Sequence, residues 1–371
     1  MCSNSQEQIF GNQFNLCNPH SIYDLRAMLE DKDRTELSDL GEFGLIDRIA
    51  KSVELQQKST VKGIGDDAAV IGTGKQKTLI STDLLLEGIH FDLGYVPLKH
   101  LGYKAVAVNL SDIYAMNGKP THITISLGLS SRFPLEAIDE LYTGIFLACD
   151  KYKVDLVGGD TTTSVSGLTI SVTAIGEASE ENIVYRNGAK ETDLICVSGD
   201  LGAAYLGLQL LEREKAIFKE NPEIQPDLSG HDYVLERQLK PEPRADIIDI
   251  LELEKVVPTS MIDISDGLSS ELMHICTQSD VGCRIYIEKL PIDHTTALAA
   301  EALNLDTTIS ALNGGEDYEL LFTVDLKDYD RLKDNPAIRV IGHITDKGDG
   351  YNLVSGEQIM PLQAQGWKHL Q

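Results

Sequence analysis

The sequence predicts an α+β protein built from two domains. The chain of 371 residues is too long for one ordinary hydrophobic core. Short apolar strands also mix with amphipathic helices along it, and two such mixed passages meet near residues 187–192. We therefore expect domains at residues 41–190 and 191–371, after an N-terminal extension at residues 1–40.

In the first domain, several stretches carry apolar residues at helical spacing. The clearest stretch is residues 135–152, where Leu135, Leu141 and Ile145 share one face. We predict helices from Phe43 onward, at 100–116 and at 135–152, and strands at 78–82, 121–129, 154–157 and 168–175. Within the N-terminal extension, residues 21–30 are expected to be partly helical.

The second domain is expected to be α+β, with a framework made mostly of strands. Its predicted strands are residues 194–197, 260–264, 284–287, 318–324 and 339–344. Helices are predicted at 201–212 and 266–276. The polar, proline-containing stretch at 221–232 predicts a loop.

The overall charge argues against two classes of partner. The chain has 32 Lys and Arg residues against 58 Asp and Glu residues, a formal net charge of −26. Nucleic acids and anionic lipids both need a basic surface, so we expect neither a nucleic-acid nor a membrane partner. No apolar run approaches the roughly 18 residues of a membrane span. The six cysteines are scattered without a close pair, so we expect a cytoplasmic protein with reduced thiols.

Acidic residues gather at five places together with glycine or small hydroxyl residues. These places are residues 63–67, 81–83, 109–112, 158–162 and 263–267. Each is expected in a tight turn where an apolar element ends at the edge of a sheet. Carboxylates bind magnesium, which bridges to substrate phosphates, and glycine lets backbone N–H groups approach phosphate oxygens. For one such place, an Asp that merely caps a turn is the better interpretation. Five in one chain favour metal-dependent phosphoryl transfer.

The same segments resemble the motifs of the thiamine-monophosphate kinase family. The match begins near Gly41, continues in order to the end of the chain, and is specific because so many motifs occur together. The matching segments are Gly-Ile-Gly-Asp-Asp-Ala-Ala-Val at 63–70, Ser-Thr-Asp at 81–83 followed by His-Phe at 90–91, and residues 104–112, 157–162, 186–189, 262–268, 314–320 and 366–369.

The resemblance implies the architecture of aminoimidazole ribonucleotide synthetase. In that fold the sheet of an N-terminal α+β domain dimerises into a barrel, and a C-terminal α+β domain follows, so a homodimer is expected. The implied activity is magnesium- and ATP-dependent phosphorylation of thiamine monophosphate to thiamine diphosphate by direct in-line transfer. Carried over position by position, the implied magnesium ligands are Asp67, Ser81, Thr82, Asp83, Asp112, Asp160, Asp263 and Asp266. The implied ATP contacts are Tyr142, Gly159, Asp160, Arg186 and Ser265, and the implied acceptor contacts are His90, Glu316 and Trp367.

Three of these residues also have a simpler structural interpretation. Arg186 offers a forked positive charge that suits phosphate, but a surface ion pair would explain it as well. Trp367, the sole tryptophan, can stack on a cationic acceptor or tether the C-terminal tail. A histidine such as His90 is more often structural, and only its position after residues 81–83 favours the acceptor side. No strong base is required, because an acceptor phosphate is already mostly ionised, with a second pKa of about 6.

Other functions remain open at this point. Selenophosphate synthetase and purine-synthesis ligases share the architecture, although the former typically carries a reactive Cys and Lys in a glycine-rich N-terminal segment. Cys2 and Cys17 lie in no such segment. A non-catalytic protein that binds nucleotides or divalent cations is the alternative from a different class, and it predicts cation binding without ADP release.

Overall fold

The computed structural model describes residues 37–364. The chain divides into two compact units, one containing residues up to 52 and the other residues 53–367. In the first unit, helix α2 (Leu37–Ser52) is interrupted at Gly41, whose φ of 65° and ψ of 178° are not helical. A helix was predicted from Phe43 onward, and the structure extends it to Leu37 across this break. The predicted helix at 21–30 lies outside the described residues.

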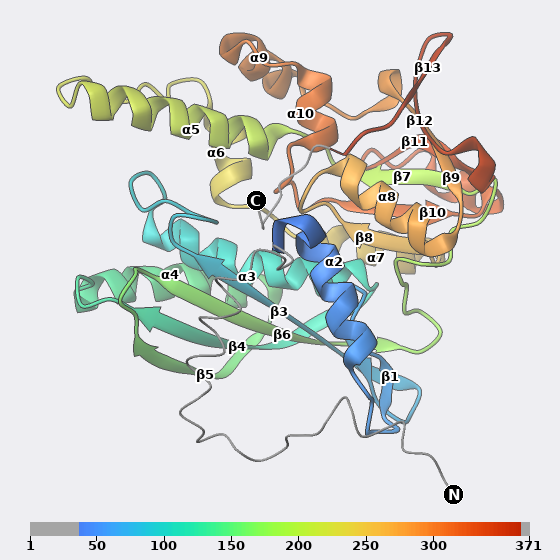
Figure 1. Ribbon diagram of the computed structural model, residues 1–371, viewed down its shortest axis with the longest axis horizontal. Coiled ribbons are helices and arrows are strands. Elements are labelled where there is room, and N and C mark those ends of the chain that lie inside the picture. Colours follow the sequence, from blue (N-terminus) through green and yellow to red (C-terminus); the bar gives the residue numbers. More distant parts are fainter. Residues whose placement is uncertain (1–36, 365–371) are drawn as a thin grey trace, which may run out of the picture. The chain divides into compact units, whose positions relative to one another are not determined.

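Two sheets, each formed by its own stretch of chain, make up the second unit (Figure 1). The first sheet has six strands in the order β1-β2-β3-β6-β4-β5, and only the β4–β5 pair is parallel. Its strands are β1 (Thr60–Lys62), β2 (Ala69–Ile71), β3 (Gln76–Leu86), β4 (Lys119–Leu129), β5 (Asp155–Thr163) and β6 (Thr169–Ser179). Helices α3 (Leu98–Ala115) and α4 (Leu135–Tyr152) lie over one face of this sheet (Figure 1).

Helix α3 is buried on nearly every side and packs very closely against α4. A β-carbon at Gly102 would lie 2.0 Å from the carbonyl oxygen of Leu141, and one at Gly144 would lie 1.8 Å from the carbonyl oxygen of Lys99. Neither position has room for a side chain. The two glycines therefore allow the backbones of α3 and α4 to touch, which sets how deeply α3 sits in the core.

The second sheet has seven strands in the order β13-β12-β9-β11-β7-β10-β8, and only the β12–β9 pair is parallel. Its strands are β7 (Leu194–Ser198), β8 (Ser260–Asp263), β9 (Gly282–Tyr286), β10 (Leu320–Val324), β11 (Ile338–Thr345), β12 (Tyr351–Ser355) and β13 (Gln358–Pro361). The helices of this half are α5 (Ala203–Glu220), α6 (Asp232–Leu239), α7 (Ala245–Glu254), α8 (Leu268–Ser279), α9 (His294–Leu303), α10 (Thr307–Asn313) and α11 (Tyr329–Leu332). Three short 3₁₀ helices complete it: η1 (Ile287–Lys289), η2 (Leu326–Asp328) and η3 (Lys347–Asp349).

The structure confirms the strongly periodic elements and corrects two groups of predictions. Helix α4 has the predicted bounds, 135–152. Strands β3 and β5 were predicted to end at residues 82 and 157, but both continue, to Leu86 and Thr163. The second half also contains helices α6, α7, α9 and α10, which were not predicted individually, although the α+β character of this half was expected. Two of these helices begin with ordinary capping aspartates, Asp293 and Asp306, whose signals were overlooked.

Within residues 37–364, no helix is long and apolar enough to cross a membrane. The domain bounds at residues 40/41 and 190/191 stay a prediction. The two sheets are compatible with the second bound, because one uses residues up to 179 and the other starts at residue 194.

Candidate active site

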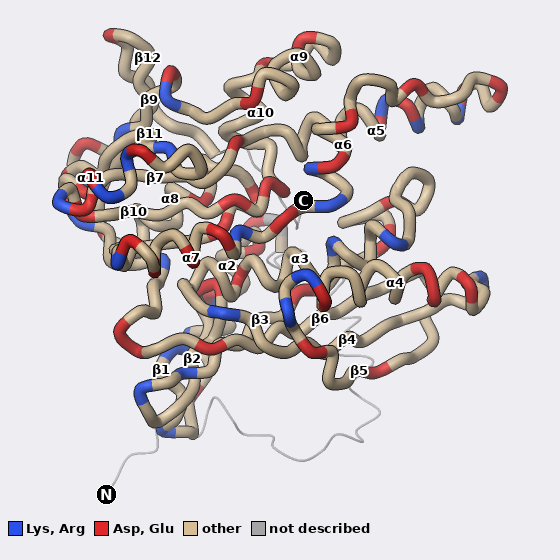
Figure 2. The backbone as a smooth tube through the Cα atoms, turned by 180° about the vertical axis from the view of Figure 1, so that it is seen from behind, with Lys and Arg blue, Asp and Glu red and all other residues tan. Residues whose placement is uncertain are grey.

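Three carboxylates from separate parts of the second unit meet beside α3. They belong to Asp67 in the loop between β1 and β2, Asp112 on α3 and Asp263 at the end of β8, and one oxygen of each lies within 4.8 Å of the others. Acidic positions, red in the tube view, occur along the whole described chain (Figure 2), and the fold brings these three together. Two serine hydroxyls donate hydrogen bonds to carboxylates of this cluster. Ser81 donates to Asp112 Oδ2, and Ser111 donates to Asp263 Oδ2 at 2.6 Å.

The cluster carries more negative than positive charge. Burial, and then the charges of Asp83, Asp263 and Asp67, raise the pKa of Asp112 well above its usual range. Burial and the charge of Asp67 likewise raise the pKa of Asp263 to about 7. A guanidinium partly offsets this charge, since Arg186 donates to Asp67 Oδ1 from Nη2 at 2.6 Å and from Nε at 3.2 Å. The arrangement therefore favours a bound cation.

The chemistry of these donors fits magnesium. Asp67 Oδ2 is buried and has no hydrogen-bond partner among the described residues. A buried carboxylate oxygen without a donor is costly, and a divalent cation would satisfy it. The donors are all oxygens, without thiol or imidazole, which suits magnesium better than a softer metal.

The other predicted metal ligands are only partly brought to this cluster. Ser81 and Asp83 alternate with Thr82 along β3, and successive side chains of a strand point to opposite faces of the sheet. Ser81 contacts Asp112 on the side that α3 covers. The Thr82 hydroxyl instead donates to the carbonyl of Val172 at 3.0 Å, so its side chain is turned away from the carboxylates. Asp266 lies in the loop after β8, and Asp160 lies on β5.

Three of the five acidic places are not turns at the ends of strands, contrary to the prediction. Residues 81–83 lie inside β3, residues 109–112 lie inside α3, and residues 158–162 lie inside β5. Only residues 63–67 and 263–267 leave a strand for a loop. Gly159 of β5 does not mark a turn, because it allows close pairing with β4. A β-carbon at Gly159 would lie 1.8 Å from the carbonyl oxygen of Ile125 on β4.

Three of the five predicted ATP contacts line one open cavity of about 370 Å³. Tyr142, Gly159 and Asp160 lie there together with Ile125, Leu156, Gly158 and Thr161. The remaining two contacts lie elsewhere, Arg186 beside the carboxylates and Ser265 in the loop after β8. The cavity thus combines apolar walls with glycine backbone, which suits a nucleotide.

Glu271 of α8 fixes the loop that contains Ser265 and Asp266. Its Oε1 accepts hydrogen bonds from the backbone N–H groups of Asp266 at 2.8 Å and Ser265 at 3.2 Å, and from the Ser265 hydroxyl at 3.2 Å. Burial, followed by the charge of Asp266, raises the pKa of Glu271 to about 8. Glu271 is not among the predicted site residues, although its position early in α8 is typical of a residue that turns back to bind the preceding loop.

The predicted acceptor residues lie in tightly constrained segments. Glu316 has a left-handed φ of 57°, and its carboxylate contacts Lys104 Nζ at 3.0 Å and accepts from Gln238 Nε2 at 2.7 Å. His90 lies in the turn after β3, where its Nδ1 accepts from the backbone N–H of Leu86 at 3.0 Å. That bond leaves the ring proton of a neutral His90 on Nε2. Trp367 lies outside the described residues.

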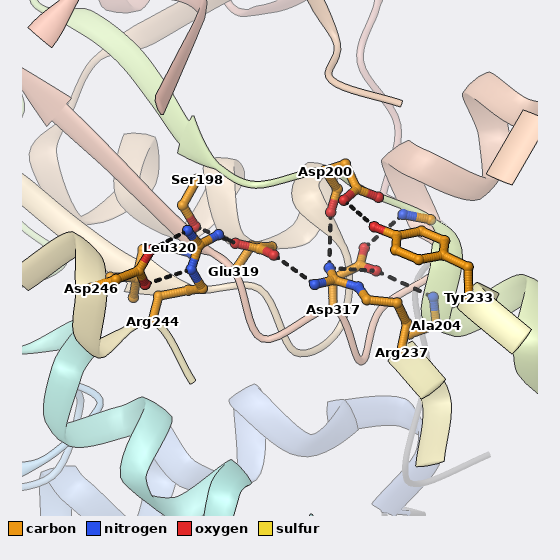
Figure 3. A network of polar contacts seen from close by, with 11 residues as sticks. Ser198, Asp200, Ala204, Tyr233, Arg237, Arg244, Asp246, Asp317, Glu319 and Leu320 are labelled. Carbon is orange, nitrogen blue, oxygen red and sulfur yellow. Dashed lines mark hydrogen bonds and ion pairs between the residues drawn. The ribbon is translucent and has the colours of Figure 1, made fainter. Parts of the chain in front are cut away.

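A network of ion pairs holds the segment that follows Glu316 (Figure 3). The buried Glu319 carboxylate accepts from Arg237 Nη1 at 2.9 Å, from Arg244 and from Ser198. The buried Asp317 carboxylate accepts from the backbone N–H of Gly202 at 2.8 Å, just before α5 begins. Residues 316–319 are therefore anchored on both sides and cannot move freely.

Lys104, Asn109 and Ser111 also contribute to the site, and all three lie in the family motif at residues 104–112. Asn109 Oδ1 accepts from the backbone N–H of Asp83 at 3.0 Å, and Ser111 holds Asp263. Lys104 and Ser111 are seven residues apart, which places them on one face of a helix. This seven-residue spacing in the sequence therefore indicates that Lys104 and Ser111 face the same part of the site.

The chain is similar to proteins of known type over most of its length. The family model described as AIR synthase related protein, N-terminal domain, matches residues 65–178. A thiamine-monophosphate kinase from Buchnera aphidicola subsp. Schizaphis graminum is 37% identical over 339 residues, covering 88% of this chain and 98% of that protein. One from Bacillus subtilis (strain 168) is 33% identical over 338 residues, covering 89% and 99%.

The structure described as AaThiL complexed with AMPPCP and TMP superposes with a TM-score of 0.77. It is 34% identical and covers 91% of this chain and 100% of that one. These likenesses confirm the α+β fold of the aminoimidazole ribonucleotide synthetase type that the sequence analysis expected.

Proposed function

Because this chain belongs to the thiamine-monophosphate kinase family, we propose that it transfers the terminal phosphate of ATP to thiamine monophosphate in a direct, in-line, magnesium-dependent reaction. The chain is accordingly an enzyme, a kinase whose acceptor is itself a phosphate. The observation that carries the proposal is the meeting of Asp67, Asp112 and Asp263 within 4.8 Å in a chain that also has an open cavity of about 370 Å³ lined by Tyr142 and Gly159. The structure solved with AMPPCP and TMP supports both substrates.

In the proposed mechanism, the residues of this chain bind and align but do not remove a proton. Asp67, Asp112 and Asp263 would hold the cation, and the hydroxyls of Ser81 and Ser111 fix the orientation of two of these carboxylates. Bound magnesium would supply positive charge that offsets the repulsion between the two phosphate groups. The acceptor phosphate is already ionised near neutral pH, so catalysis consists of positioning and electrostatic stabilisation.

The remaining assignments complete the proposed site. ATP would occupy the cavity beside Tyr142, Gly159 and Asp160, with Arg186 and Ser265 nearer the phosphates. We propose that Ser81, Thr82, Asp83, Asp160 and Asp266 take part in metal binding as the family resemblance implies. Thr82 could do so only through its backbone carbonyl or after a change of rotamer, because its hydroxyl is directed to the opposite face.

An ADP-release assay tests this function. Purified protein is incubated with ATP and a panel of phosphorylated acceptors, with and without magnesium, and the product is identified by mass. ADP and thiamine diphosphate are expected with thiamine monophosphate and magnesium together. Cation or nucleotide binding without ADP release from any acceptor would show that the chain is a non-catalytic binding protein instead.

We also propose that the enzyme is a homodimer formed through the six-stranded sheet. Strand β5 is the last strand of that sheet, and every residue of β5 except Leu156 is exposed. An exposed edge strand of this length invites pairing, and dimerisation would cover it. Sedimentation velocity at assay concentrations is expected to give twice the mass of the chain. A fully active monomer under those conditions would contradict the prediction.

The acceptor assignment predicts a selective effect of Trp367→Ala. A tryptophan face against a cationic ring contributes about 0.5–2 kcal/mol. The KM for thiamine monophosphate should therefore rise roughly 2- to 30-fold, at about 1.4 kcal/mol per tenfold. The KM for ATP should hardly change, since the proposed ATP contacts and the metal hold the nucleotide without Trp367. Equal weakening of both substrates would favour the interpretation of Trp367 as a tether for the C-terminal tail.

A further inference from the structure

Lys104 is a buried lysine whose partner is the proposed acceptor residue. Its side chain is 6% exposed, whereas the side chain of Glu316 is 29% exposed. The ammonium lies 3.0 Å from Glu316 Oε1 and donates to the backbone carbonyl of Gln238 at 3.1 Å. The lysine thus lies behind the glutamate, and only the glutamate is open to a ligand.

Burial of the Lys104 ammonium destabilises the folded state unless the ammonium is paired and hydrogen-bonded. Lys104 meets that condition. Within residues 37–364, its Nζ contacts the Glu316 carboxylate and the backbone carbonyl of Gln238, and no others. Gln238 in turn donates to Glu316 Oε2 at 2.7 Å. Both oxygens of the Glu316 carboxylate therefore have partners within the protein, and these contacts fix the orientation of the carboxylate plane.

The backbone around Glu316 is hydrogen-bonded to the loop that follows Asp263. Glu316 and Tyr318 both adopt left-handed conformations, with φ of 57° and 50°. Their N–H groups donate to the carbonyls of Ser265 at 2.7 Å and Ile264 at 2.9 Å, in the loop that follows Asp263. The segment thus packs directly against the loop after β8, and the Glu316 carboxylate is connected to the metal-binding carboxylates through a short, rigid path.

Helix α3 provides a second connection between Glu316 and the metal-binding carboxylates. Lys104 contacts Glu316, and Ser111, seven residues later, contacts Asp263. Seven residues of helix span about 10 Å, and they bring both side chains to one face. A single buried helix therefore sets the separation between the acceptor carboxylate and one of the metal-binding carboxylates.

We propose that Lys104 is a positioning residue that acts through Glu316: with Gln238 it orients the Glu316 carboxylate toward the acceptor and sets its distance from the metal-binding carboxylates. This inference rests on the proposed function, because Glu316 is an acceptor contact only if thiamine monophosphate is the acceptor. Lys104 itself does not touch the substrate.

A double-mutant cycle of Lys104→Met and Glu316→Gln tests the proposal. Steady-state kinetics are measured with thiamine monophosphate varied at saturating ATP, and with ATP varied at saturating acceptor. Lys104→Met is expected to lower kcat/KM for the acceptor about 10- to 100-fold and to leave the KM for ATP within about twofold. In the Glu316→Gln background, Lys104→Met should cause little further loss, because the group through which it acts is already changed.

Lys77→Met is the matched control. Lys77 is also 6% exposed in its side chain and also paired, with Glu180 at 3.5 Å, but it lies on β3 away from Glu316. This variant should retain the acceptor kinetics of the wild-type enzyme. Gln238→Leu is a second variant, which removes one hydrogen bond to Glu316 but leaves the Lys104–Glu316 pair intact. It should raise the KM for the acceptor by about 3- to 10-fold.

The outcomes separate the two proposals. If the wild-type protein forms no thiamine diphosphate, the proposed function fails and this inference fails with it. If the wild-type protein is active but Gln238→Leu and Lys104→Met leave acceptor kinetics unchanged, only the positioning role is overturned. Equal losses for ATP and acceptor, or an undiminished effect of Lys104→Met in the Glu316→Gln background, would also overturn it. If Lys104→Met does not fold, Gln238→Leu alone and in the Glu316→Gln background decides the question.

Discussion

Asp112→Asn is expected to lower the rate of ADP formation by about 10²- to 10³-fold at saturating magnesium, while the protein stays folded. Asp112 is one of the three carboxylates that meet within 4.8 Å. An amide keeps the shape of the side chain but loses the charge that a cation requires. The folded state should tolerate the change because ionised Asp112 is opposed by burial and by its acidic neighbours, Asp83 foremost.

Thermal unfolding with and without magnesium accompanies this measurement. Magnesium should raise the midpoint of wild-type unfolding, because it binds the folded state, and should raise that of Asp112→Asn much less. Asp334→Asn is the matched control, since Asp334 is an exposed carboxylate in the turn after α11, outside the proposed site and the proposed dimer interface. It should behave as the wild-type enzyme does. Wild-type turnover in Asp112→Asn would remove Asp112 from the proposed metal site.

Gly144→Ala is expected to reduce the free energy of unfolding by about 3 kcal/mol. A β-carbon at this position would lie 1.8 Å from the carbonyl oxygen of Lys99 on α3. Alanine normally stabilises a helix relative to glycine by up to about 1 kcal/mol, so the direction of the change is diagnostic of the close helix crossing. Denaturant unfolding, followed by circular dichroism, measures it.

Gly74→Ala is the control for this substitution. No atom lies within 4 Å of a β-carbon built at Gly74. Its free energy of unfolding should change by less than about 0.5 kcal/mol. A stability of Gly144→Ala equal to that of the wild-type protein would mean that α3 and α4 can separate at no cost.

The parts of the fold that the sequence predicted well are those in which one periodicity dominates. Helix α4 shows apolar residues at helical spacing over its whole length, and its bounds were predicted correctly. Strand β5 was predicted too short because Gly158 and Gly159 usually mark a turn, whereas here Gly159 is required by close contact with β4. That requirement comes from the neighbouring strand, which local sequence does not show.

The candidate site was predictable in its residue types but not in its geometry. Asp67, Asp112 and Asp263 were all named beforehand, and they do come together. The family resemblance implies Thr82 as a ligand, yet neighbouring residues of a strand face opposite ways, and its hydroxyl bonds to β6 instead. The role of Lys104 is not predictable from the sequence, because its partner is more than 200 residues away and only the folded chain shows the pair.

The buried helix α3 also limits how this family of sequences can change in length. Each residue of a helix turns the chain by about 100°. One inserted or deleted residue between Lys104 and Ser111 would therefore rotate one of the two side chains away from its partner, Glu316 or Asp263. Single substitutions on the other faces of α3 leave that angle unchanged. The segment between these residues should consequently keep a constant length.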